Sequence, residues 1–376
     1  MTLPASDETP IGPVGSRIAV IGGGILGVRI ARELLTPIAG GAIATGGVVL
    51  VTRRPDRAKV LSGSFGSSVA VFSDEHGTTE LGAEVSTVVL AGAAGTQLDA
   101  ARDNLRAGRH VVATSDDPDE VEAMLALGPD ARASNRTFVI GAAMAPGLSC
   151  LLVSHAADLL DRVDEIHVAR HGAAGPACAR QRLRALRGTA TDWRDGEWVE
   201  RAGFSGRELC WFPDPIGARD CYRAALADPM LLVPVFEGVE RVTARIAANR
   251  RDRALAPFPV LLPPPVEGGL GAVRVELRGE VGGERRTVVY GVLDRPAVAA
   301  SATAAVTALR VAAGGCAPGA TGLAGLGATR PILVELARRG VRAAVFEGAH
   351  ASPLEVQVPV PEATVCTVTP EGEENR

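Results

Sequence analysis

Three glycines near the start of the chain have the spacing of a nucleotide-binding turn. Gly22, Gly24 and Gly27 fit G-x-G-x-x-G, after an apolar run at 18–21 and before a segment with apolar residues at helical spacing. In such a turn the first glycine permits a tight bend, the second lets a pyrophosphate approach the backbone, and the third lets helix and strand pack closely. The helix start then offers unpaired N–H groups to the phosphates. The spacing predicts a dinucleotide site formed by Gly22, Gly24, Ile25, Leu26 and Gly27.

The end of the next apolar run predicts which dinucleotide is preferred. Residues 48–51 suggest a buried strand that ends in Thr52, Arg53 and Arg54. An acidic residue at this point suits the ribose 2′-hydroxyl of NAD, whereas a small polar residue followed by arginine suits the 2′-phosphate of NADP. Asp56 argues for NAD, although it also suits the cap of the following helix. We therefore expect NADP(H) as the cofactor, with NAD(H) less favoured.

A loop of small residues follows the apolar run 85–90. Ala91, Gly92 and Ala93 would let the ribose and nicotinamide lie against the backbone at the carboxyl end of a parallel strand. An ordinary tight connection between strand and helix would use the same residues. We count these three residues as cofactor-binding candidates.

A proline in the turn 141–149 predicts a second helix start at the same edge of the sheet. Pro146 can begin a helix because its missing N–H would have no partner there anyway. A substrate carboxylate could be held at that point. Met144, Pro146 and Gly147 are therefore candidate substrate-binding residues.

A histidine in the second half of the chain is the leading candidate for proton transfer. His171 lies where a probable strand, 163–171, runs into a glycine-rich loop, and histidine titrates near neutral pH. A purely structural role is the alternative. Tyr222, with Asp220 beside it, is the competing catalytic candidate.

Arginines and tryptophans of the same region are candidates for substrate binding. A guanidinium pairs with a carboxylate through two parallel hydrogen bonds, which nominates Arg170, Arg223 and Arg245. All three tryptophans lie between 193 and 211, and Trp193 and Trp211 could wall a substrate and exclude water. Packing in a hydrophobic core is the alternative for both.

Composition excludes several classes of protein and partner. The 376 residues carry a formal charge of −4, so we expect no nucleic-acid partner, and the apolar stretch 34–52 is too interrupted to suggest a membrane span. Six scattered cysteines without a CxxC pair predict reduced thiols, no metal site and a cytoplasmic protein. Only Lys59 is a lysine, which disfavours Schiff-base chemistry and a lysine general base.

The order of patterns predicts an α/β fold with two sheets. Six apolar runs alternating with helices predict a doubly wound parallel Rossmann sheet, and alternating runs beyond residue 163 predict an inserted α+β domain with a mixed or antiparallel sheet. The expected parts are a disordered tail (1–16), a Rossmann domain (17–150), a substrate-binding and dimerisation domain (151–295), returning C-terminal helices (296–348) and a second tail (349–376).

Three segments together resemble the saccharopine dehydrogenase-like reductases, which are similar in plan to the diaminopimelate dehydrogenases. They are the glycine turn at 22–27, the stretch VVLAGAAGTQLDAARDNLRAGRHVVATS at 88–115, and GAAMAPGLS at 141–149. The resemblance covers residues 17–150 well and the remainder loosely. It implies an NADP(H)-binding Rossmann domain, an inserted sheet domain that carries substrate and a homodimer interface, and hydride transfer at a carbon that bears nitrogen. The second domain lacks the lysine on which some members rely.

We therefore expect an NADP(H)-dependent oxidoreductase that reduces an imine or oxidises an amine on a small, amino-acid-like substrate bearing a carboxylate or an amine. One alternative is a synthase or transferase that regenerates its bound NAD(P) in each cycle, as homospermidine synthase does. Another alternative is a nucleotide-binding protein without catalytic activity.

Overall fold

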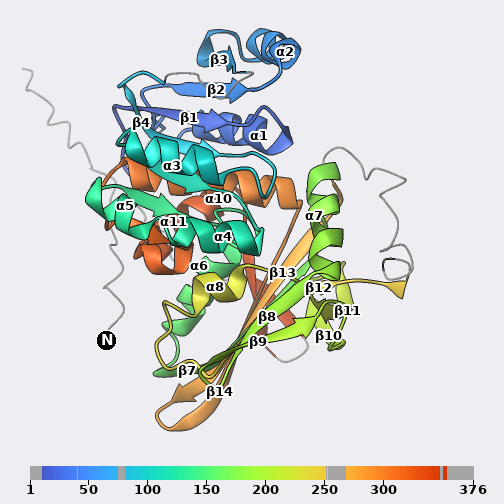
Figure 1. Ribbon diagram of the computed structural model, residues 1–376. Helices are drawn as coiled ribbons and strands as arrows, with labels where there is room; N and C mark the ends of the chain where they lie inside the picture. The colour runs from blue at the N-terminus through green and yellow to red at the C-terminus, as the bar shows by residue number, and fades with distance from the viewer. Residues whose placement is uncertain are drawn as a thin grey trace, which may run out of the picture.

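The short apolar runs of the first 140 residues form strands of a parallel sheet in the computed structural model, which describes residues 11–39, 41–74, 81–250, 252, 268–347 and 350–353. Every neighbouring pair of strands in this seven-stranded sheet is parallel (Figure 1). The spatial order is β15-β6-β5-β4-β1-β2-β3, so β1 lies where the chain order reverses, which is the place where doubly wound sheets bind ligands. The strands are β1 (Arg17–Ile21), β2 (Val48–Thr52), β3 (Val69–Ser73), β4 (Val85–Leu90), β5 (His110–Ala113), β6 (Thr137–Val139) and β15 (Gly319–Thr321).

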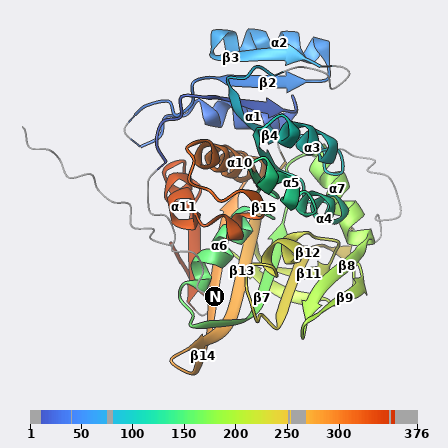
Figure 2. The same ribbon diagram turned by 60° about the vertical axis from the view of Figure 1, so that its left-hand side comes forward.

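Helices cover both faces of this sheet, as its apolar strands require. One face carries α3 (Leu98–Arg106), α4 (Pro118–Leu125) and α5 (Gly128–Ala133). The other carries α1 (Ile25–Leu34), against which α10 (Pro296–Ala312) packs (Figure 2). The chain therefore returns to the first sheet after residue 295. α2 (Pro55–Phe65) lies at the β3 edge.

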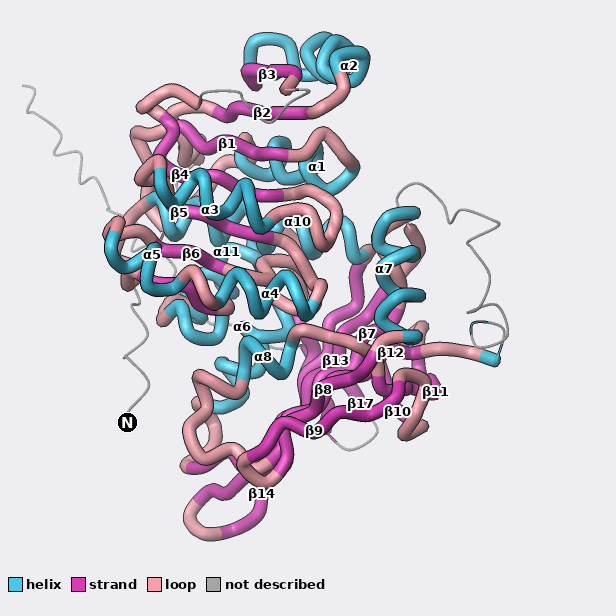
Figure 3. Tube along the Cα trace, in the orientation of Figure 1, coloured by secondary structure: helices cyan, strands magenta, loops and turns pink. Residues whose placement is uncertain are grey.

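Beyond residue 160 the chain forms a ten-stranded mixed sheet, which Figure 3 shows as a group of strands below the first sheet. β7 pairs in parallel with β12 and antiparallel with β13, and residues such as Ile166 and Val168 alternate with polar ones along β7. This confirms the expected α/β fold with a Rossmann sheet and a second sheet. The strands are β7 (Arg162–His171), β8 (Thr189–Arg194), β9 (Glu197–Ala202), β10 (Glu208–Phe212), β11 (Gly217–Arg223), β12 (Arg241–Ala247), β13 (Gly271–Val281), β14 (Glu284–Asp294), β16 (Ala343–Glu347) and β17 (His350–Pro353).

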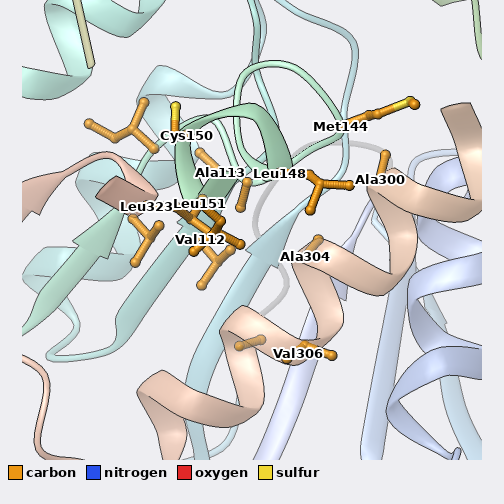
Figure 4. Close-up of a cluster of buried hydrophobic side chains, with 14 of the residues drawn as sticks. Val112, Ala113, Met144, Leu148, Cys150, Leu151, Ala300, Ala304, Val306 and Leu323 are labelled. Atoms are coloured by element: carbon orange, nitrogen blue, oxygen red, sulfur yellow. The ribbon is translucent and has the colours of Figure 1, made fainter. Parts of the chain in front are cut away.

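One apolar helix joins the two sheets. α6 (Leu148–Ala157) packs on β7, β13 and β14 and also contacts α10 and α11 (Thr329–Arg338). Nine of its ten residues are buried, and Leu148 and Leu151 lie among side chains of β5 and α10 (Figure 4). A single hydrophobic core therefore runs from one sheet into the other, which holds the two sheets in a fixed relation.

Three expectations about the chain ends and connections need correction or fall outside the described residues. Residues 11–16 are not a disordered tail, because Ile11 and Val14 are buried and Val14 forms a bridge with Thr45. Residues 350–353 form β17 rather than part of a tail. The rest of the two predicted tails, 1–10 and 354–376, lies outside the described residues. α7 (Pro176–Arg187) is a three-turn helix that was not predicted from the sequence.

Among the described residues, no helix combines the length and the apolar character needed to cross a bilayer.

His110 provides a test of how the starts of β5 and β6 are joined in the first sheet. Its Nδ1 accepts a hydrogen bond of 3.1 Å from the Thr137 backbone N–H, so that nitrogen must be unprotonated. Burial, and secondarily the nearby charge of Arg136, lower the pKa of His110 below its ordinary value of 6.5. The unfolded chain therefore binds a proton at His110 more readily than the folded chain does. The contribution of neutral His110 to the free energy of unfolding is present above about pH 6.5 and is lost as the pH falls below that value. We predict that the free energy of unfolding decreases from pH 7.5 to pH 5.5, and decreases less in His110→Asn, which keeps an acceptor but does not titrate.

Chemical denaturation at the two pH values measures both free energies. Equal pH dependence in wild type and variant would contradict this account of His110.

Candidate functional site

A cleft of about 970 Å³ lies between the carboxyl ends of the first sheet's strands and the adjoining end of the second sheet. Its walls include the turn after β1, the ends of β2 and β4, the end of β7 and the helix α7. Among the described residues, seven arginines and two aspartates line it, although the whole chain carries a net negative charge. The cleft is therefore suited to an anionic ligand.

Two of the three glycines in the turn after β1 are required because there is no room for a side chain. Gly22 has φ +135°, and a Cβ there would lie 2.6 Å from the Ala91 carbonyl oxygen. A Cβ on Gly27 would collide with the Gly22 carbonyl oxygen, whereas a Cβ on Gly24 would meet nothing within 4 Å. Gly24 is thus not needed for packing, and its lack of a side chain leaves the backbone at the start of α1 open to the cleft.

The five predicted residues of the turn lie in or beside the cleft. Gly22, Gly24, Ile25 and Leu26 line the cleft, and Gly27 lies behind it against β1. The residues present therefore fit a dinucleotide at this helix start.

Thr52, Arg53 and Arg54 line the cleft at the end of β2. The side chains of Arg53 and Arg54 are exposed and make no hydrogen bond or ion pair within the described part of the chain. Asp56 lies in the first turn of α2 and does not line the cleft. Neighbouring Arg57 lines it too and donates from Nε to the Gly23 carbonyl at 3.2 Å.

A buried carboxylate fixes the loop after β4. Ala91, Gly92 and Ala93 line the cleft, and the loop beyond them is held by Glu120 of α4. The carboxylate accepts hydrogen bonds from the backbone N–H of Gly95 at 2.7 Å and of Leu98 at 3.0 Å. It also accepts from the Gln97 backbone N–H and, at 2.5 Å, from the Ser115 hydroxyl. One side chain thus caps the start of α3 and ties the loops after β4 and β5 together.

Arg170 is the main cation of the second sheet within the cleft. It donates from Nη1 to Asp116 at 3.0 Å and to the Ala145 carbonyl at 2.5 Å, so it connects β7 to two loops of the first sheet. Burial works against its charge, but Asp116 and then Asp228 raise the pKa of Arg170 above its ordinary value. Arg170 is therefore a fixed positive charge at the junction of the two sheets.

His171 follows Arg170 and also lines the cleft. Its Nδ1 is buried without a hydrogen-bond partner, and its ring lies 6.2 Å from the Phe212 ring. Burial and then the charges of Arg219 and Arg182 lower the pKa of His171, against an opposing effect of Asp252. The imidazole is thus mainly neutral at pH 7 in the absence of a bound anion.

Several predicted residues lie elsewhere. Met144 lines the cleft, whereas Pro146 and Gly147 are buried and do not reach it. Six candidates of the second sheet do not line the cleft either: Tyr222, Asp220, Arg223, Arg245, Trp193 and Trp211.

The contacts of those six side chains explain what they do. Arg223 pairs with Asp192 at 2.9 Å and Arg245 with Glu208 at 2.7 Å, so neither guanidinium is open to a substrate. Asp220 pairs with Arg207 at 3.0 Å, and Tyr222 packs edge-on against Phe204. Trp193 packs on Trp198 and donates to the Val239 carbonyl, and Trp211 is 60% exposed. The structure therefore does not bring these residues to His171.

One wall of the cleft, the helix α7, was not predicted from the sequence. α7 contributes Cys178, Arg180, Gln181, Arg182 and Arg184 to the lining. Burial is the largest influence on the pKa of Cys178 and raises it, so this thiol is not a nucleophile at neutral pH. Gly175 followed by Pro176 could have indicated this helix, because proline is common at the first position of a helix.

Comparisons with known proteins identify the fold. No protein-family model matches the chain, and no curated protein matches its sequence. Apo saccharopine dehydrogenase (L-Glu forming) from Saccharomyces cerevisiae matches with a TM-score of 0.65 at 13% identity, over 88% of this chain and 100% of that one. The DAP dehydrogenase of C. glutamicum in complex with DAP matches with a TM-score of 0.45 at 17% identity, over 87% of this chain and 100% of that one. The match to the yeast protein shows that the chain has a saccharopine dehydrogenase-like Rossmann fold, as its motifs had suggested.

Two glycine substitutions separate the packing role of the turn from its binding role. Gly27→Ala places a Cβ against the Gly22 carbonyl, and we expect it to lose about 1–3 kcal/mol of unfolding free energy. Gly24→Ala adds a Cβ in open space, so it should lose less than about 1 kcal/mol, since alanine is only a poorer helix cap. It should nevertheless weaken dinucleotide binding by about tenfold or more, because the methyl group occupies the phosphate approach.

Thermal unfolding and titration with NADPH give the two readouts. Normal NADPH affinity in Gly24→Ala would contradict the assigned geometry.

Proposed function

We propose that this chain is an NADP(H)-dependent oxidoreductase that reduces an imine, or oxidises the corresponding amine, on an amino-acid-like substrate. The observation that carries the proposal is one cleft in which the glycine turn of the first sheet and the Arg170–His171 pair of the second sheet both take part. The fold match supports an oxidoreductase, because the matching yeast protein is a saccharopine dehydrogenase.

The end of β2 supports NADP(H) over NAD(H). Arg53 and Arg54 are exposed cations beside the turn, and the acidic residue closest in sequence, Asp56, lies outside the lining. A 2′-phosphate placed there would gain charge-assisted hydrogen bonds that a 2′-hydroxyl cannot match.

Arg170 and His171 would act on the substrate side. When bound, the nicotinamide supplies or accepts a hydride. Arg170, fixed by Asp116 and the Ala145 carbonyl, offers its remaining N–H groups to a substrate carboxylate and so orients the substrate. The protonated form of His171 donates the proton that the substrate nitrogen gains during reduction, and the neutral form accepts it in the reverse direction. Met144, Ala145 and Ala300 contribute apolar groups to the lining, which would limit the access of water to the reacting atoms.

Cofactor preference tests the first part of the proposal. We expect Arg53→Gln with Arg54→Gln to weaken NADPH binding by about tenfold to a hundredfold and to leave NADH binding within about twofold, since only NADPH carries the 2′-phosphate. Isothermal titration with both coenzymes measures this selectivity. Equal losses for NADPH and NADH would place the phosphate elsewhere.

The pH dependence of reduction tests the second part. NADPH oxidation by a panel of 2-oxo acids with ammonium or an amino acid is followed from pH 5 to 9. Because burial lowers the pKa of His171 below 6.5, we expect kcat/KM for reduction to fall as the pH rises through that pKa. His171→Asn should lose this limb and about 10²–10⁴-fold in rate.

An unchanged pH profile in His171→Asn would remove His171 from the reaction. Product formed without net NADPH oxidation would instead favour a synthase that regenerates its nucleotide.

A further inference from the structure

α7 is a strongly basic helix in a chain that is acidic overall. Its twelve residues, PACARQRLRALR, include four arginines and no acidic residue. Three of those arginines, Arg180, Arg182 and Arg184, line the cleft. Figure 1 shows α7 standing at the end of the second sheet that faces the first sheet. Its charge is therefore turned toward the space in which a ligand would lie.

Within the described part of the chain, one of these three arginines is neutralised and the other two have no partner. Arg182 pairs with Asp252 at 3.0 Å and donates to the Ala247 carbonyl at 2.6 Å. Arg180 and Arg184 are exposed, and within the described residues neither side chain makes a hydrogen bond or an ion pair. Residues four apart on a helix are neighbours, so two like charges at these positions destabilise it slightly. This arrangement has an electrostatic cost that a bound anion would remove.

The opposite wall of the cleft also carries groups that can bind phosphate. It presents the open start of α1 at Gly24 together with Arg53 and Arg54. Guanidinium groups bind phosphate oxygens through paired, charge-assisted hydrogen bonds. A phosphorylated ligand between the two walls would therefore meet donors from both sheets.

We propose that Arg180 and Arg184 of α7 form a phosphate-binding site on the second-sheet wall of the cleft. Its ligand class is a phosphate ester or phosphoanhydride. The source is either the dinucleotide bound to the glycine turn, which would then link the two walls, or a phosphate group on the substrate. The first source rests on the proposed function, and the second does not require it.

The test uses the full-length protein and two probes, NADPH and inorganic pyrophosphate. Arg180→Gln with Arg184→Gln removes the site, and Arg187→Gln is the matched control, because Arg187 belongs to the same helix but does not line the cleft. We expect the double variant to raise the Kd of NADPH by about tenfold or more at low salt, and the difference from wild type to shrink at 0.5 M salt. The control should stay within about twofold of wild type. Circular dichroism and thermal unfolding check that each variant is folded.

The outcomes separate the two proposals. If the double variant loses pyrophosphate binding but keeps NADPH binding, the site stands and its phosphate belongs to the substrate. If wild type binds pyrophosphate through these arginines but does not bind NADPH, the site stands and the proposed function fails. If the folded double variant binds both probes as tightly as wild type does, the site is overturned while the proposed function is untouched.

Discussion

The close approach of α1 to the end of β1 is the constraint on which the rest of the cleft depends. Gly27 lies against the Gly22 carbonyl and Gly22 against Ala91, with no room for a side chain at either point. This contact brings the start of α1, with its unpaired N–H groups, to the edge where β1, β2 and β4 end. It thereby leaves the backbone at Gly24 open to the cleft.

A second contact connects this opening to the other sheet. Arg170 reaches from β7 to Asp116 and to the Ala145 carbonyl, both in loops of the first sheet. Glu120 holds the neighbouring loops through hydrogen bonds from backbone N–H groups and Ser115. α6 and α10 belong to the hydrophobic core that runs from one sheet to the other, so this core supports both walls. Walls that are packed on one core favour a ligand that spans both.

Much of the first sheet could be predicted because most of its strands contain a short run of apolar residues between clear turns. β15 could not, since Gly319–Thr321 is three residues without any pattern. α7 was missed because its buried positions include Gln181 and its arginines hide the apolar period. The glycine turn was correctly predicted to lie between a strand and a helix, because its residues are local in sequence. Of the predicted substrate-binding residues, Met144 and Arg170 line the cleft, but those on other strands of the second sheet do not. Closeness in sequence does not tell which strands are neighbours: Arg223 and the catalytic candidate Tyr222 lie on β11, which β12 separates from β7.

The most direct measurement of the central claim is a crystal structure of the protein with NADP⁺. The account predicts the pyrophosphate at the start of α1 beside Gly24, the 2′-phosphate on Arg53 or Arg54, and the nicotinamide on the side of Ala91–Ala93 that faces His171. A dinucleotide bound away from the glycine turn, or a nicotinamide that points out of the cleft, would contradict it.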